Sequence, residues 1–124
     1  MQSTSLNYAD VEKRLFEACP PIIPIYENEF SYWGDWDKDR PGNYLVFATV
    51  VVPYLITQLD DPRDEQSITR LFALFEEMAA STDPEVVNLV KLEVVLKLAR
   101  DSAHLAKARK HMGPRLQHLL RALR

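Results

Sequence analysis

The chain has 124 residues, 47% of them hydrophobic, and a formal net charge of −3, which suits a single domain (1–124) with one core and excludes two independent ones. The single Cys19 excludes an internal disulfide and a multi-cysteine zinc site, and predicts a reducing, cytoplasmic setting. The N-terminus lacks the pattern of a signal peptide, and the longest apolar run, 44–56, is shorter than the roughly 20 residues of a membrane helix.

Charge is distributed unevenly along the chain. Residues 1–90 contain 16 acidic and 6 basic residues, whereas residues 91–124 contain 2 acidic and 9 basic residues. A surface of one sign accelerates and selects association with an oppositely charged partner. The same asymmetry would also arise if the two halves neutralised each other within the fold, and both interpretations stay open here.

The N-terminal third predicts two helices. The first covers 5–19 with Asn7 as its N-cap, because apolar residues recur every three to four positions. Pro21 or Pro24 opens a short second helix, and Gly34 stands where a glycine is expected after a helix end. Three aromatic residues of this helix share one face and are first of all core candidates: Tyr26, Phe30 and Trp33.

An acidic and aromatic segment overlaps and follows this second helix. Its alternating aspartates invite comparison with a calcium loop, but the loop lacks the glycine at its sixth position, and Val46 stands where the bidentate glutamate would be. A solvated acidic loop and a protein-contact surface are the remaining interpretations, since tryptophan and tyrosine beside carboxylates are typical of interfaces. The side chains concerned are Glu27, Glu29, Tyr32, Trp33, Asp35, Trp36, Asp37 and Asp39.

The apolar run 44–59 is predicted to be the central helix of the fold. Its β-branched residues would also suit a strand, but 16 residues without a turn signal favour a helix. Asn43 is its expected cap, and Pro53 is expected to kink it by removing the hydrogen bond to the carbonyl of Thr49. Apolar character on nearly all sides indicates burial from several directions.

Two further helices begin with an aspartate followed by proline, a strong N-terminal signal. Asp61 opens a helix to about Ala80, and Asp83 opens one to about Ala99. The predicted inward faces are Ile68, Leu71, Phe72, Phe75 and Met78 in the first, and Val86, Leu89, Val90, Leu92 and Leu96 in the second. The fold class predicted is therefore all-α: one compact bundle of about six to seven helices, arranged as antiparallel hairpins around the central helix.

Asp101 or Ser102 caps a basic helix that Gly113 and Pro114 end before a last helical turn or two. Basic residues near helix C-termini complement the helix dipole. Nucleic-acid binding is the functional alternative, but the acidic remainder of the chain would repel phosphates, and no nucleic-acid partner is predicted. The basic residues in question are Lys107, Arg109, Lys110, Arg115, Arg121 and Arg124.

No pattern in the chain indicates an enzyme, a metal site or a cofactor. His104, His111 and His118 are seven residues apart, but Gly113 and Pro114 interrupt the helix that would align them. Cys19 has no histidine near it in sequence, and glycine-rich phosphate loops are absent. Non-catalytic protein binding is the predicted class of function.

Three segments of the second half, with a looser match at 43–55, carry a family resemblance. The first is an FxEEM-like helix end, formed by Phe75, Glu76, Glu77 and Met78. The second is a D-x-x-V-x-N helix start, formed by Asp83, Val86 and Asn88. The third is a K-A-x-x-x-M-G-P segment, formed by Lys107, Ala108, Met112, Gly113 and Pro114. The pattern resembles small α-helical immunity proteins encoded beside bacterial polymorphic toxins of the Rhs or contact-dependent type. Where family members often carry a Glu and Leu pair, this chain has Val95 to Leu98, which leaves the subgroup open.

The resemblance implies a cytoplasmic, non-catalytic protein that binds a cognate toxin one to one and occludes its active site or substrate surface. Toxins that act on nucleic acids are commonly basic at their clefts, which an acidic surface would complement. The expected contact set is the acidic and aromatic segment above, with a second patch that the central helix could bring alongside it: Asp60, Asp61, Asp64 and Glu65. Helix capping is the structural alternative for this second patch, and a helical adaptor that binds another basic protein is the alternative function.

Overall fold

The computed structural model describes residues 5–34 and 40–123, and within these ranges every regular element is helical, which confirms the all-α prediction. Three stretches of consecutive segments (8–18, 43–60 and 84–99) each form one continuous helix, so that the described residues form seven helices. The segments are η1 (Tyr8–Asp10), α1 (Val11–Ala18), α2 (Ile22–Glu29), α3 (Asn43–Val46), η2 (Phe47–Val51), α4 (Val52–Asp60), α5 (Glu65–Ala79), α6 (Pro84–Val90), η3 (Lys91–Val95), α7 (Leu96–Ala99), α8 (Ser102–Arg109) and α9 (Pro114–Ala122).

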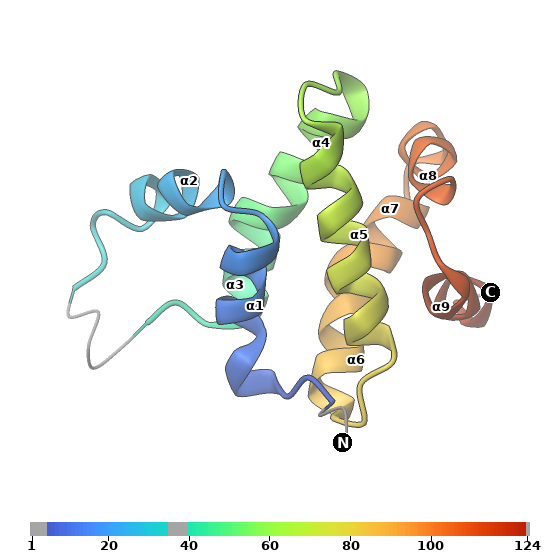
Figure 1. The fold of residues 1–124 in the computed structure, drawn as a ribbon, viewed down its shortest axis with the longest axis horizontal. Helices are drawn as coiled ribbons and strands as arrows, with labels where there is room; N and C mark the ends of the chain where they lie inside the picture. Colours follow the sequence, from blue (N-terminus) through green and yellow to red (C-terminus); the bar gives the residue numbers. More distant parts are fainter. Residues whose placement is uncertain (1–4, 35–39, 124) are drawn as a thin grey trace.

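The helices form antiparallel hairpins around two neighbouring central helices (Figure 1). The predicted central helix, 43–60, packs against α2, α5, α8 and η3, and α5 packs against α1, α4, α6 and α9. Helix α2 lies at one end of the longest axis of the molecule, and α8 and α9 lie at the other. No helix in the described ranges is both long and apolar enough to cross a membrane.

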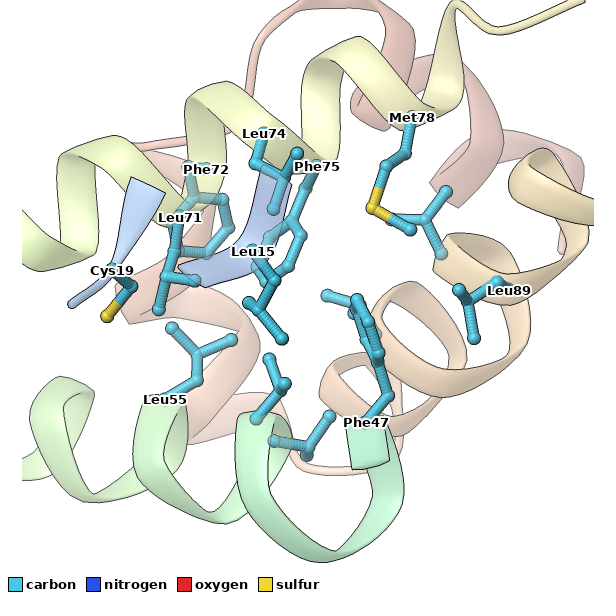
Figure 2. Close-up of a cluster of buried hydrophobic side chains, with 14 of the residues drawn as sticks. Leu15, Cys19, Phe47, Leu55, Leu71, Phe72, Leu74, Phe75, Met78 and Leu89 are labelled. Atoms are coloured by element: carbon cyan, nitrogen blue, oxygen red, sulfur yellow. The ribbon is translucent and has the colours of Figure 1, made fainter. Parts of the chain in front are cut away.

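The core is a single cluster of aliphatic and aromatic side chains contributed by almost every helix (Figure 2). Phe47 and Phe75 are fully buried at its centre, with ring centroids 6.4 Å apart. Burial of such side chains contributes roughly 1.5–3 kcal/mol each to folding, which makes this cluster the main source of stability. The inward stripe predicted for α5 is confirmed, because all its members are buried: Ile68, Leu71, Phe72, Phe75 and Met78.

The central helix ends at Asp60, one residue later than predicted, and the next helix, α5, begins at Glu65 rather than directly after Asp61. Asp61 does not cap α5; Asp64 does, since its Oδ1 accepts a hydrogen bond from the backbone N–H of Ser67 at 3.0 Å. The side-chain carbonyl of Gln58 accepts from the N–H groups of Arg63 and Asp64, and these bonds hold the chain in a turn past Pro62. Asp61 and Pro62 therefore form a turn, and the true cap of α5 lies three residues after Asp61.

The other predicted caps have mixed outcomes. Asp83 caps α6 and Asp101 caps α8 through side-chain hydrogen bonds to N–H groups of the first turn, as predicted. Asn7 precedes the 3₁₀ turn η1 but makes no capping bond, so the first helix covers 8–18 rather than 5–19. Asn43 is not a cap either: Gly42 takes that position, and the Asn43 side-chain amide donates to the carbonyl of Tyr8 at 2.9 Å.

Two π-helical segments change the registers that simple periodicity predicts. The structure shows π-type bonding over η2, which ends at Val51, two residues before Pro53, and the kink expected at Pro53 stays a prediction. The second segment, η3, inserts an extra residue into the helical turn, so the inward face shifts along the chain. Leu92 was predicted to face inward and is 42% exposed, whereas Val94 and Val95 are buried.

Candidate functional site

The first candidate surface is the acidic arm, defined here as residues 22–34, which comprises α2 and the turn after it. The helix starts after Pro21 and ends at Glu29, five residues before Gly34. The arm projects at one end of the molecule (Figure 1). Tyr32 is 75% exposed, and Glu27 and Glu29 are also exposed. Neither glutamate forms an ion pair with another residue in the described ranges.

A ladder of aromatic rings fixes the arm to the core. Phe16 of α1 meets Tyr26 edge to face at 5.0 Å, Tyr26 lies 5.3 Å from Phe30, and Phe30 meets Trp33 at 90° and 5.6 Å. Tyr26 and Phe30 are buried as predicted, and Trp33 is half-buried against the core, with Tyr32 6.2 Å away on its outer side. Aromatic pairs of this geometry add about 0.5–1.5 kcal/mol each beyond burial, so the arm has a rigid base.

A polar clamp joins the arm to the segment that precedes α3. Arg40 Nη2 donates to Glu12 Oε1 at 2.6 Å, and the hydroxyl of Tyr26 donates to Glu12 Oε2 at 3.1 Å. Burial, and next the charge of Glu12, raise the pKa of Tyr26, so the phenol is a neutral donor at physiological pH. These bonds hold the segment around Arg40, through which the chain runs into the central helix, against α1 and the arm.

Four members of the expected contact set lie outside the residues that the structure describes: Asp35, Trp36, Asp37 and Asp39. Their assignment to the contact surface stays a prediction. The described part of the set, Glu27, Glu29, Tyr32 and Trp33, lies together on the arm.

The second patch carries structural bonds of its own. Asp60 at the end of α4 accepts from His104 Nε2 at 3.0 Å and from Lys107 Nζ at 3.2 Å, both on α8. Asp61 pairs with Arg63 at 3.0 Å. The patch thus connects α4 to α8, and its charge is partly neutralised.

Asp64 and Glu65 complete this patch. Both oxygens of Asp64 serve the α5 cap, since Oδ2 also accepts from the hydroxyl of Ser67 at 2.6 Å, and these bonds lower the pKa of Asp64. Glu65 is exposed and forms no ion pair within 5–34 and 40–123. The end of α4 lies well apart from the arm in Figure 1, so the central helix does not bring the two patches side by side.

Three acidic residues among those that carry the family resemblance make bonds that connect helices and segments of the fold. Glu76 of α5 accepts hydrogen bonds from the N–H groups of Arg115 at 2.6 Å and Leu116 at 3.2 Å, and so caps α9 from another helix. Glu77 pairs with Arg14 at 2.6 Å. Asp83 caps α6 and also accepts from the N–H of Tyr8, which ties the N-terminal segment to the bundle. Glu76, Glu77 and Asp83 therefore have structural roles, and the sequence alone gave no sign that Glu76 reaches α9.

The three histidines do not meet. His104 bridges Asp60 and Asp101, His111 stacks on Phe72 with centroids 5.4 Å apart, and His118 is exposed on α9. Among the described residues, no group of three His, Cys, Asp or Glu side chains lies close enough to hold a metal ion.

Cys19 is fully buried, and burial raises the pKa of its thiol, with Ser67 and Tyr54 as neighbouring polar groups. A thiol in this environment is protonated at neutral pH and shielded from substrates. Its chemistry is that of a small core side chain.

The ion pair between Glu12 and Arg40, which lies beside the arm, is visible only in the tertiary structure. Glu12 and Arg40 are 28 residues apart, and no spacing rule connects a residue of the first helix with one at the end of an acidic loop. The weak signal was that Arg40 is one of only two cations in a strongly acidic stretch, 27–40. Such a cation is expected to find a carboxylate.

A sequence model described as a domain of unknown function (DUF7674) matches residues 12–124. No curated protein matches the chain, and no solved structure does.

Proposed function

We propose that this chain, which belongs to the DUF7674 family, is a non-catalytic protein that neutralises a bacterial toxin domain by binding it through the acidic arm. One observation carries the proposal. The arm presents a 75% exposed tyrosine beside two carboxylates without ion-pair partners among the described residues, on a base fixed by aromatic packing. A pre-ordered surface of this kind loses little conformational entropy on binding.

The chemistry of the arm suits a basic partner. Tyrosine provides a large apolar contact with a polar tip, and flanking carboxylates accelerate encounter with a positive cleft. A cleft that binds nucleic-acid phosphates offers this charge, and an acidic arm can occupy it in their place. The immunity role itself rests on the family resemblance, whose motif residues serve the fold and therefore support a shared architecture.

The test is co-expression in bacteria with the product of the neighbouring upstream gene, read by growth and by pull-down of the tagged protein. The expected result is growth rescue and a stable one-to-one complex. The charge-reversing pair Glu27→Lys and Glu29→Lys, and separately Tyr32→Ala, should weaken the complex at least tenfold, about 1.4 kcal/mol, while the helical circular dichroism is unchanged.

A matched control reverses two exposed carboxylates elsewhere, Asp10→Lys and Glu17→Lys, and should leave the complex intact. If the neighbour is harmless and unbound, the toxin-neutralising role is wrong. A stable complex with a protein that is not toxic would instead identify a helical adaptor. If both charge-reversing pairs bind equally well, the arm is not the interface.

A further inference from the structure

Two adjoining hollows are lined by residues of α7, α8 and α9. Helices α8 and α9 lie at the end of the molecule opposite the acidic arm (Figure 1). One has a volume of about 270 Å³ and is apolar, with one arginine at its rim. The other has a volume of about 370 Å³ and is basic. The first is lined by Leu96, Ala99, Arg100, Leu105, Leu120 and Leu123, and the second by Arg109, Gln117, Leu120 and Arg121. Leu120 is common to both, so the hollows form one surface, called here the α7–α9 surface.

The arginines of this surface are available for a ligand. The fold neutralises Lys97 through Glu93 and Lys107 through Asp60. No comparable ion pair within the described ranges involves Arg100, Arg109 or Arg121, and all three are exposed. Three arginines without such ion pairs among the described residues therefore lie around the hollows, and Lys110 and Arg115 carry further positive charge at this end outside them.

Helix dipoles explain part of this pattern. Arg100 follows the end of α7, Arg109 ends α8, and Arg121 lies in the last turn of α9, where cations are stabilised by typically 0.3–1 kcal/mol. This role accounts for the sign of the charge at each helix end. It does not account for the apolar hollow that Arg100 lines, in which leucine side chains are partly exposed.

The lining distinguishes among classes of anionic partner. Single-stranded nucleic acid binds by stacking bases on aromatic rings, and no aromatic side chain of the described residues lines either hollow. A membrane surface binds a convex amphipathic face, whereas these leucines line a concavity. A partner helix whose apolar side chains are flanked by carboxylates can fill the apolar hollow and pair with the arginines.

We propose that the α7–α9 surface is a second interface, which binds an acidic amphipathic helix of a protein partner. Side chains at positions i and i+4 of a helix lie about 5–6 Å apart, so a leucine can enter the apolar hollow while a glutamate one turn away reaches the basic one. The surface has the opposite charge to the arm and lies at the opposite end of the molecule, so it requires a different partner segment. The inference does not depend on the toxin-neutralising role.

The experiment uses a fluorescein-labelled synthetic helical peptide of about 18 residues, with leucines along one face and glutamates beside them. The matched control peptide has the same composition, with the leucines scattered around the helix. Fluorescence anisotropy should show the amphipathic peptide binding at least tenfold more tightly than the control, a difference of about 1.4 kcal/mol. Added salt should weaken this binding, because the arginines are exposed.

Variants locate the site. Arg109→Glu with Arg121→Glu should weaken peptide binding about tenfold or more, equivalent to about 1.4 kcal/mol. Lys110→Glu with Arg115→Glu makes the same change in net charge on residues that line neither hollow, and should have little effect. Leu123→Ser tests the apolar hollow at a partly exposed position near the end of α9 and should also weaken binding.

Four outcomes would overturn the proposal. If the amphipathic peptide does not bind, the surface is not a helix-binding site. If both peptides bind equally tightly, the binding comes from non-specific charge attraction alone. Tighter binding of a duplex DNA of equal charge would assign it to nucleic acid. Sedimentation that shows a dimer of the free protein, lost in Arg109→Glu with Arg121→Glu, would assign it to a second copy of the chain.

Discussion

Gly113 lies where any side chain would contact the carboxylate of Glu76. A Cβ at this position would lie 2.6 Å from both the carboxyl carbon and Oε1 of Glu76. That carboxylate also holds the first N–H groups of α9. The glycine therefore leaves room for a cap that comes from another helix.

We predict that Glu76→Ala and Gly113→Ala each destabilise the fold by about 1–2 kcal/mol, because each removes the α9 cap. Chemical denaturation measures the free energy of unfolding of both variants and of the double variant. Since both substitutions remove one interaction, the double variant should cost clearly less than the sum. Additive effects would contradict this interpretation.

The thiol of Cys19 is predicted to be unreactive in the folded protein. Its pKa is raised by burial, so less thiolate exists at neutral pH than in an exposed cysteine, and the side chain is fully covered. A thiol-specific chromogenic reagent should label it only after denaturant is added. Rapid labelling of the native protein would show that this part of the core opens.

At the scale of elements, the π segment η3 decides which residues between 91 and 98 are buried. We predict that Val95→Ala destabilises the fold by about 2 kcal/mol, because the two deleted methyl groups contribute about 0.8–1 kcal/mol each in a packed core. Leu92→Ala, which removes more atoms from a side chain that is 42% exposed, should cost less. Thermal or chemical denaturation of the two variants compares them, and the reverse order would mean that the helix keeps an uninterrupted α register.

The bonds of Asp60 at the end of α4 with His104 and Lys107 of α8 should make the free energy of unfolding depend on pH in the acidic range. His104 and Lys107 lower the pKa of Asp60 below its usual value of 3.8. A carboxyl whose folded pKa is depressed contributes stability above its unfolded pKa and loses it as pH falls toward the folded pKa. Asp60→Asn should therefore destabilise the protein at neutral pH and reduce the stability lost below roughly pH 4.

Urea denaturation of wild type and Asp60→Asn at neutral and acidic pH tests this expectation. Asp64 and Asp101 also have lowered pKa values, caused first by bonds from Ser67 and from the backbone of His104, so part of the acid sensitivity will remain in the variant. An unchanged pH profile would mean that the bridge contributes nothing in solution.

At the scale of the whole molecule, the fold separates two surfaces of opposite charge. The acidic arm and the α7–α9 surface lie at opposite ends of the longest axis (Figure 1), with the apolar core between them. Effects of substitutions that are distant and share no partner usually add within about 0.3–0.5 kcal/mol. Glu27→Lys with Glu29→Lys should therefore leave the affinity of the acidic peptide unchanged within that margin, as measured by anisotropy. A larger change would reveal coupling through the core.

The helical fold class followed from apolar periodicity and from aspartate caps such as Asp83 and Asp101, because these are local signals. The misplaced start at Asp61 has a local cause that the capping rules do not contain, since the side chain of Gln58, five and six residues before Arg63 and Asp64, holds the turn that precedes α5. The arm was also predictable in part, because Glu27, Glu29 and Tyr32 are exposed, as their polarity suggested. Trp33 was a candidate for both the core and the contact surface, and the structure shows that it is half-buried against the core.

The sequence by itself determined the helices, their apolar faces and the acidic and basic halves of the chain, because periodicity, capping and charge act over a few residues. The tertiary structure decided what these parts do together. It joined Glu76 to α9 and Asp60 to His104 across 39 and 44 residues, and it placed an apolar hollow with one arginine beside a basic hollow with two. Such contacts depend on how helices pack, and packing is set by side-chain shapes from distant parts of the chain.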